Sequence, residues 1–349
     1  MVASGHPGRH NHSGSCSGTR YVAAWKCYPT TSARPPMLSF IVRRLLATIP
    51  VMAVVAIIVF SLLYLTPGDP AAVLAGEQAT ADDIERIRTS LGLDEPYIVR
   101  FGQWIGGVLR GDLGTSIFSR RPVMDLIVQR LEPTIALTLA SLLIAVMIAV
   151  PLGVIAAWRA GSMIDRLAMS FAVLGFSIPV FVLSYLLIAL ISVELKWLPV
   201  QGYVPIAYGL GPFLEHLILP ALSLGIINAA LIARITRTTM LEVLGQDYIR
   251  AARAKGLSVS RVLIRHALKN AAVPIVTVIG ISFALLISGV VVTETVFNIP
   301  GLGRLTVDAI LRRDYPVIQG VILVFSATYV IVNLIVDLSY GLFDPRIQH

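Results

Sequence analysis

The stretch LLATIPVMAVVAIIVFSLLYLT, residues 45–66, holds 22 consecutive residues without an Asp, Glu, Lys or Arg. About 20 apolar residues in a helix suffice to cross the hydrocarbon core of a bilayer. A run of 17 uncharged residues, 217–233, lies at the lower limit, and Arg234 and Arg237 behind it can extend toward the interface. Four further uncharged runs have at least 22 residues each: 133–157, 167–193, 270–293 and 315–336. The sequence therefore predicts six membrane-spanning helices.

The composition supports an all-α membrane protein. Of the 349 residues, 56% are hydrophobic and 14% are charged, against about 25% charged in a typical soluble domain. The alternative is that the runs are buried helices of a soluble protein, but helices in globular proteins average only about 11–12 residues. Prolines inside the runs do not contradict the prediction, because neighbouring helices satisfy the backbone groups that a proline frees in a membrane bundle.

Basic residues predict the orientation, since short cytoplasmic loops carry the excess of Lys and Arg. Segment 234–272 has eight basic residues against two acids, and Arg43 and Arg44 precede the first run. Segment 194–216 has one basic residue against two acids. Both chain ends and segment 234–272 are therefore expected in the cytoplasm. The net charge of +8 belongs largely to this face, so nucleic-acid binding is not needed to explain it.

Residues 1–36 differ from the rest of the chain. They hold both cysteines, Cys16 and Cys27, three histidines near Cys16, and no acids. A metal site is the alternative reading, but the spacing fits no standard zinc pattern, which favours a disordered tail. Met37 opens a basic and then apolar segment that suits a true N-terminus, so we expect 1–36 to reflect an over-long start. The first transmembrane helix is predicted within 37–66, and the run 45–66 is too long for a signal peptide.

The predicted extracytoplasmic segment 67–132 lies between the first two spans. Within it, TADDIERIRTSLGLDEP predicts a surface helix, with Thr80 and Asp83 in capping-box positions and Gly92 and Pro96 at its end. Two interpretations stay open for the segment: an outer vestibule or docking surface, and a lid that covers helix ends. Residues 133–349 then form the predicted core with five more spans and the cytoplasmic loop 234–272.

Motifs of enzymes are missing from the sequence, which has no GxxxxGK[ST], HExxH or GxSxG. Glu294, at the outer end of the fifth run, is either an ion or substrate contact or an interfacial charge that ends the helix. No row of acids or histidines lies within the spans, which disfavours an ion-driven secondary transporter. Polar residues that are candidates for a solute pathway, or alternatively for helix packing, are Asn228, Ser282, Ser288 and Asn333. We predict no catalytic or metal site, and energy supplied by another chain.

The loop between the fourth and fifth runs contains DYIRAARAKGLS, residues 247–258, a polar, small-residue, helix-forming stretch. Its alanines allow a close approach of a partner backbone, and its Arg and Lys residues favour an oriented contact. Gly256 permits a sharp turn out of the helix. Such a helix between two spans would act as a lever, whereas the plain alternative is an ordinary positive-inside loop.

This segment resembles the EAA loop of ABC importer permeases. Ala251, Ala252 and Gly256 occupy the Ala-Ala and Gly positions, and Leu268 the later Leu position. Arg250 stands where the general motif has Glu. DYIRAARAKGLSVSRVLIRHALKNAAVPIV is similar to the form in the dipeptide/oligopeptide/nickel branch. The likeness extends over 37–349 through TPGDP, LRGDLGTS, HLILPALSLG and ETVFNIPGLGRLTVDAILRRDYPVIQG, and it fits the first-type permease of that branch.

The resemblance implies that the chain forms half of a translocation pathway. The implied partners are a second homologous permease, two cytoplasmic subunits that bind ATP and Mg, and an extracytoplasmic substrate-binding protein. The chain itself would lie in the cell inner membrane and hold no cofactor. The ATPase would be coupled through the 247–269 loop, with Asp247, Arg250, Ala251, Ala252, Gly256 and Leu268 as its contact residues. Short peptides are the implied substrate, with nickel as the neighbouring alternative.

Overall fold

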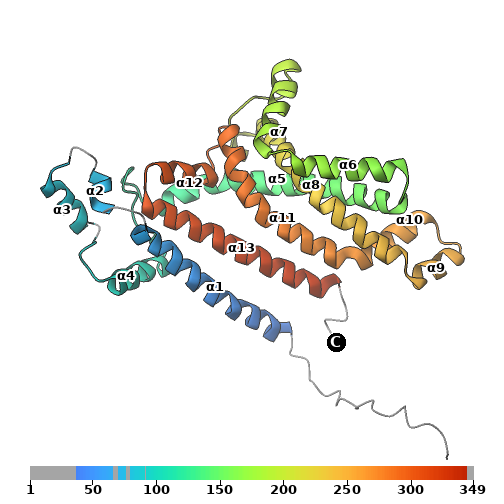
Figure 1. Cartoon of the computed structure of the whole chain (residues 1–349), viewed down its shortest axis with the longest axis horizontal. Helices are drawn as coiled ribbons and strands as arrows, with labels where there is room; N and C mark the ends of the chain where they lie inside the picture. Colours follow the sequence, from blue (N-terminus) through green and yellow to red (C-terminus); the bar gives the residue numbers. More distant parts are fainter. Residues whose placement is uncertain (1–36, 66–69, 76–78, 91, 344–349) are drawn as a thin grey trace, which may run out of the picture.

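The computed structural model describes residues 37–65, 70–75, 79–90 and 92–343, and these residues are mostly helical with no β-strand. The predictions for the tail 1–36, including its cysteines and histidines, concern residues outside the described part of the chain. Figure 1 shows long helices running side by side along the molecule. They are α1 (Met37–Leu65), α5 (Val123–Trp158), α8 (Leu210–Leu244), α11 (Lys269–Val296) and α13 (Tyr315–Phe343).

These five helices are each long and apolar enough to cross a membrane. A bent pair, α6 (Met163–Ser177) and α7 (Val180–Leu187), the latter continued by the π-helix η1 (Ile188–Glu194), meets the same criteria of length and apolar composition when its two parts are taken together. The prediction of an all-α membrane protein with six apolar segments is confirmed in this form. One detail is wrong: run 167–193 is not one continuous helix, because it bends by 105° at Ile178 and Pro179.

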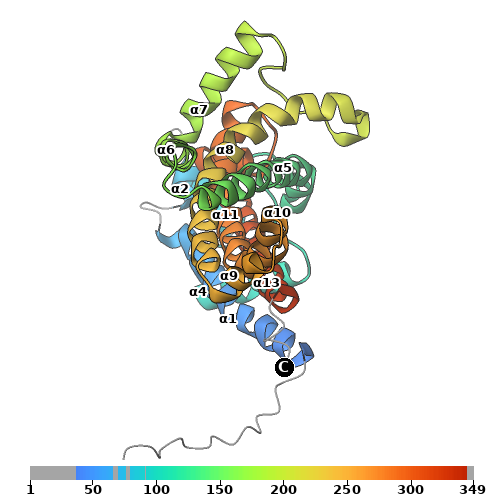
Figure 2. The same ribbon diagram turned by 90° about the vertical axis from the view of Figure 1, so that its right-hand side faces the viewer.

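The bend has a local cause. Proline disfavours helical geometry in the residue before it, and Ile178 accordingly adopts an extended φ of −89° and ψ of 122°. The helix therefore stops at Ser177 and restarts after Pro179. In Figure 2, α7 and the start of α8 project beyond the bundle.

The helices α5 and α8 form the closest packed pair of the core. On α5 a series of small, fully buried residues recurs every fourth position, namely Ser141, Ala145, Ala149 and Gly153. On α8 the facing series is Ala221, Gly225, Ala229 and Ala233. Residues four apart lie on one helix face, so two smooth ridges meet and the backbones approach closely. A Cβ added to Gly153 would lie 2.7 Å from the backbone oxygen of Ala233.

A short helix that the sequence analysis did not predict, α12 (Leu302–Leu311), connects α11 to α13. Glu294 fixes its first turn: the fully buried carboxylate accepts the hydroxyl of Thr134 at 2.6 Å and the N–H of Arg304 at 2.9 Å. The Thr134 hydroxyl oxygen in turn accepts the N–H of Leu302 at 2.8 Å. Glu294 therefore joins α11, α12 and α5, and neither role considered for it from sequence matches this cap of a helix N-terminus.

The segment between α1 and α5 contains α2 (Pro70–Ala75), α3 (Ala81–Ser90) and α4 (Tyr97–Leu109). The predicted capping box is present, because the Thr80 N–H donates to Asp83 at 3.1 Å and the Asp83 N–H donates to Thr80 Oγ1 at 3.3 Å. The Thr80 hydroxyl also donates to the Asp83 carboxylate at 2.6 Å, and this hydrogen bond, together with the one from the Thr80 N–H, holds the pKa of the Asp83 carboxyl below its usual value. Gly92, with φ of +60°, follows the helix as expected.

Candidate functional site

The loop after α8 forms a short helix, α9 (Asp247–Ala254), that stands at the far right of Figure 1. Its end is a Schellman motif: the Leu257 N–H donates to Ala252 O and the Gly256 N–H donates to Arg253 O. Gly256 has φ of +79°, a left-handed conformation that glycine adopts without steric cost. The sharp turn predicted at Gly256 is present.

One face of α9 packs against its own chain. Ile249 is fully buried in a cluster with Met240 of α8 and Ala267 before α11, and Ala252, three residues further along α9, is only 9% exposed. Leu268 is half-buried against the same cluster. Of the predicted contact residues, Ala252 and Leu268 are therefore less accessible than the others, and their role as ATPase contacts stays a prediction.

The opposite face of α9 is exposed. Of the predicted contact residues, Asp247, Arg250, Ala251 and Gly256 lie on it, together with Arg253 and Lys255. Arg250 and Asp247 form a salt bridge of 3.3 Å with side chains 74% and 96% exposed, so it contributes little to stability. Three cations and one carboxylate are therefore exposed around Ala251.

A continuous stem connects this surface to the membrane helices. The chain passes through α10 (Val259–Arg261) and the π-helix η3 (Val262–Leu268) directly into α11. The Asn270 side-chain amide donates to the Tyr248 hydroxyl at 2.8 Å and thus links the base of α11 to α9. The helix α9 is therefore connected to α8 on one side and, through η3 and this hydrogen bond, to α11 on the other.

A buried ion pair, missed in the sequence analysis, ties α8 to α6. Arg237 donates to the two carboxylate oxygens of Asp165 at 2.5 and 2.8 Å, and Asp165 also accepts the Gly161 N–H at 2.9 Å. Asp165 is only 4% exposed. The sequence did carry a signal, because Ser162 and Asp165 have capping-box spacing before an apolar run. The pair connects the bent α6–α7 unit to the part of α8 that leads into α9.

The candidate pathway residues lie differently. Asn228 is buried, and its amide donates to Leu224 O at 2.9 Å within the same helix. Ser282 is fully buried. Asn333 lines a cavity of about 320 Å³ beside Arg44 and Asp337, whereas the side chain of Ser288 lies outside the described residues. Within the described part of the chain, no group of three or more His, Cys, Asp or Glu residues is arranged to hold a metal ion.

Comparison with known families decides the identity. Residues 149–349 match the family described as "Binding-protein-dependent transport system inner membrane component", and residues 37–138 match its N-terminal membrane component. The chain belongs to this permease family. It is thus a multi-pass inner-membrane permease subunit of an ABC importer, and the predicted permease identity and membrane location are confirmed.

Curated relatives cover nearly the whole permease. A probable peptide ABC transporter permease protein, y4tP of Sinorhizobium fredii, is 54% identical over 89% of this chain and 99% of its own. The glutathione transport system permease protein GsiC of Escherichia coli K12 is 46% identical over 90% of this chain and 100% of its own. These relatives place the permease in the dipeptide/oligopeptide/nickel branch that the sequence motifs indicated.

A solved structure supports the fold. A chain of the MetNI methionine ABC transporter in inward facing conformations matches 63% of this chain and 97% of its own, with a TM-score of 0.53 and 21% identity. At this identity the likeness concerns the helical architecture alone.

Proposed function

We propose that this permease forms half of the pathway of an ATP-driven importer of di- or oligopeptides and binds a cytoplasmic ATPase through α9. The carrying observation is the geometry of α9: one face is fixed to α8 and η3 by the buried Ile249, and the other is exposed and basic. A rigid, outward-facing helix on the stems of two membrane helices suits a lever better than an ordinary loop, which needs no buried anchor.

On this proposal the α9 end of the molecule faces the cytoplasm. Two ATPase subunits bind ATP and Mg, and one of them contacts the exposed face around Ala251. A second, homologous permease completes the pathway, and an extracytoplasmic substrate-binding protein delivers the solute. Nucleotide binding must favour one conformation of the permease pair by several kcal/mol to make a minor state dominant.

A peptide substrate is supported by the two relatives, of which one is named for peptides and the other for glutathione, itself a tripeptide. Uptake of a labelled dipeptide, a labelled hexapeptide, glutathione and ⁶³Ni²⁺ by cells with and without the transporter decides among them. We expect transporter-dependent uptake of a peptide, and uptake of nickel alone would overturn the peptide assignment.

Co-purification tests the role of α9. The tagged permease is extracted from its native membrane in mild detergent as wild type, Gly256→Trp and Gly111→Trp. Both glycines have positive φ, +79° and +84°, and neither has an atom within 4 Å of an added Cβ, so the two variants introduce the same backbone strain. Gly111 lies at the end of the bundle opposite α9 and serves as the control.

We expect the wild type to recover a second permease, the ATPase subunits and the substrate-binding protein, and Gly111→Trp to recover the second permease and the ATPase subunits. Gly256→Trp should retain the second permease and lose the ATPases. Equal recovery of ATPases by both variants would contradict the docking role of α9. Recovery of the wild-type chain alone, with uptake that survives ATP depletion while an ion gradient remains, would identify a secondary transporter instead.

A further inference from the structure

Four exposed arginines lie at the end of the bundle opposite α9. Arg120 and Arg121 belong to a tight turn before α5, and Arg312 and Arg313 belong to the turn between α12 and α13. Figure 1 shows the α12–α13 turn at the other end of the molecule from α9. Within the described residues, none of these four side chains forms a salt bridge, although the segment around them contains carboxylates. We call these four residues the outer arginine cluster.

A buried carboxylate holds the two turns together. Asp314 is 4% exposed and accepts the hydroxyl of Ser116 at 2.5 Å and the N–H of Ile117 at 3.1 Å. The turn is closed by hydrogen bonds from the Ser116 N–H to Arg121 O and from the Arg120 N–H to Ser116 O. Because the Asp314 carboxylate accepts hydrogen bonds from Ser116 and Ile117 inside the turn, it does not pair with the four arginines.

The two turns also touch at the surface. The guanidinium of Arg312 lies 4.1 Å from the ring centroid of Phe118, which fixes a cation against an aromatic face. Arg120 and Arg313 both have φ of 56°, an uncommon conformation for residues other than glycine. The cluster is therefore presented by a defined backbone geometry.

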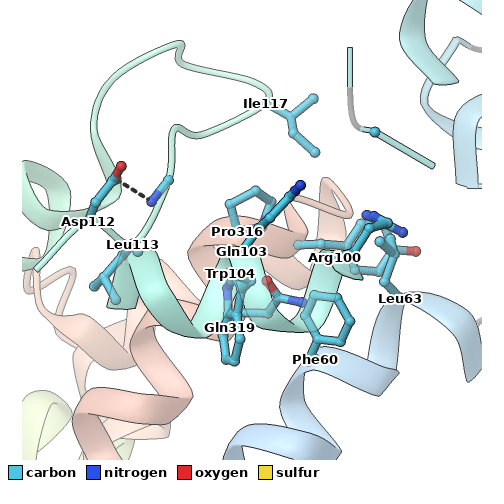
Figure 3. Close-up of a pocket in the computed structure, with 14 residues that line it drawn as sticks. Phe60, Leu63, Arg100, Gln103, Trp104, Asp112, Leu113, Ile117, Pro316 and Gln319 are labelled. Carbon is cyan, nitrogen blue, oxygen red and sulfur yellow. Dashed lines mark hydrogen bonds between the residues drawn. The ribbon is translucent and has the colours of Figure 1, made fainter. Parts of the chain in front are cut away.

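A cavity of about 600 Å³ opens beside the cluster. Figure 3 shows side chains of α1, α4, α13 and the 112–117 segment converging on it, including Arg100, Gln103, Trp104, Ile117 and Gln319. Asp112, on its rim, accepts the Gly114 N–H at 2.8 Å, so the loop around the opening is fixed as well. Ile117 thus belongs both to the cavity wall and to the turn held by Asp314. Exposed cations beside a cavity form a surface that a folded partner can complement in charge and shape.

We propose that the outer arginine cluster docks an acidic surface of the substrate-binding protein, an inference that rests on the proposed importer function. Arginine pairs with carboxylates through two parallel hydrogen bonds and is enriched at protein interfaces. Phosphates of the outer leaflet are the competing anions, but mobile headgroups need no prearranged set of cations. The rigid mounting on Asp314 favours a partner whose carboxylates have fixed positions.

Binding measurements on the complete transporter test this docking surface. The transporter is placed in nanodiscs of phosphatidylcholine, and the probe is the substrate-binding protein recovered by the co-purification above. The variant is Arg120→Gln with Arg121→Gln, and the control is Arg86→Gln, an exposed arginine of α3 in the same outer segment. The dissociation constant is measured between low and high salt.

We expect the double variant to raise the dissociation constant about tenfold at low salt and to flatten its salt dependence, because charged contacts at an interface act mainly through attraction that salt screens. Arg86→Gln should match the wild type. Unchanged affinity and an unchanged salt slope in the double variant would overturn the proposal.

Two other outcomes are informative. If binding is unchanged but the double variant alone loses its response to added phosphatidylglycerol, the cluster binds lipid phosphates and the docking proposal fails. If the wild type recovers no substrate-binding protein at all, the proposed importer function fails together with this inference. If the double variant loses affinity for the substrate-binding protein but still co-purifies with the ATPase subunits, the importer function and the docking proposal are both supported.

Discussion

Replacing Gly153 with alanine probes the contact between α5 and α8 that makes these helices one unit. The added Cβ would lie 2.7 Å from Ala233 O and 2.7 Å from Thr236 Cβ. An ordinary contact begins at 3.4 Å, so the helices must separate by about 0.7 Å or the side chain must be compressed. Overpacking of this kind costs about 1–3 kcal/mol.

Gly175→Ala is the matched control. Gly175 lies in α6 and also faces α8, but its added Cβ would lie 3.4 Å from Ala230 Cβ, an ordinary contact. Both variants gain about 0.5–1 kcal/mol because alanine favours the helix over glycine. This gain cancels in the comparison, so the difference between the two variants isolates the steric cost.

The assay is denaturant unfolding of the purified permease in detergent micelles, followed by circular dichroism. We expect Gly153→Ala to be less stable than Gly175→Ala by about 1–3 kcal/mol. Labelled-peptide uptake in vesicles should fall for Gly153→Ala and remain normal for Gly175→Ala. Equal stability of the two variants would refute the close α5–α8 contact.

Two further predictions concern buried polar contacts. Asp165→Ala should destabilise the permease by about 3 kcal/mol in the same unfolding assay, because Arg237 is left without its carboxylate. The double variant Asp165→Leu with Arg237→Met replaces both charges with apolar side chains and should recover most of the lost stability. A double variant as unstable as the single one would contradict a role confined to this pair. Glu294→Ala removes the acceptor of the Arg304 N–H, so it should speed hydrogen exchange at the start of α12 and lower the free energy of unfolding by about 2 kcal/mol. Glu294→Gln keeps one acceptor oxygen and should have a smaller effect. Unchanged exchange in both variants would disprove the cap.

The sequence predicted the spans because hydrophobic length is a strong signal, but it underestimated α8. The uncharged run 217–233 ends at Arg234, whereas the helix continues to Leu244. Along this continuation, Arg237 pairs with Asp165, which comes from a different helix. A charge count along one segment contains no information about such a partner.

Tertiary contacts also explain the other differences. Pro179 marked a break in run 167–193, but proline within a membrane helix often produces only a kink, so the 105° bend was not predictable from the residue alone. The helix α12 depends on Glu294 and Thr134, 160 residues apart. At the candidate site, the motif gave the positions of Ala251 and Ala252 without their directions. Only the packing of Ile249 shows that Ala252 faces inward and Ala251 outward.

Cysteine labelling at Ala251 tests the central claim, the docking of an ATPase on α9, most directly. Cys16 and Cys27 are first replaced by serine, and Ala251→Cys is compared with Ser119→Cys, an exposed position at the opposite end. A membrane-impermeant maleimide is applied in detergent to the permease alone and to the complete transporter. We predict that the ATPase subunits protect Ala251→Cys from labelling and leave Ser119→Cys unprotected. Equal labelling of Ala251→Cys with and without the ATPase subunits would contradict the account.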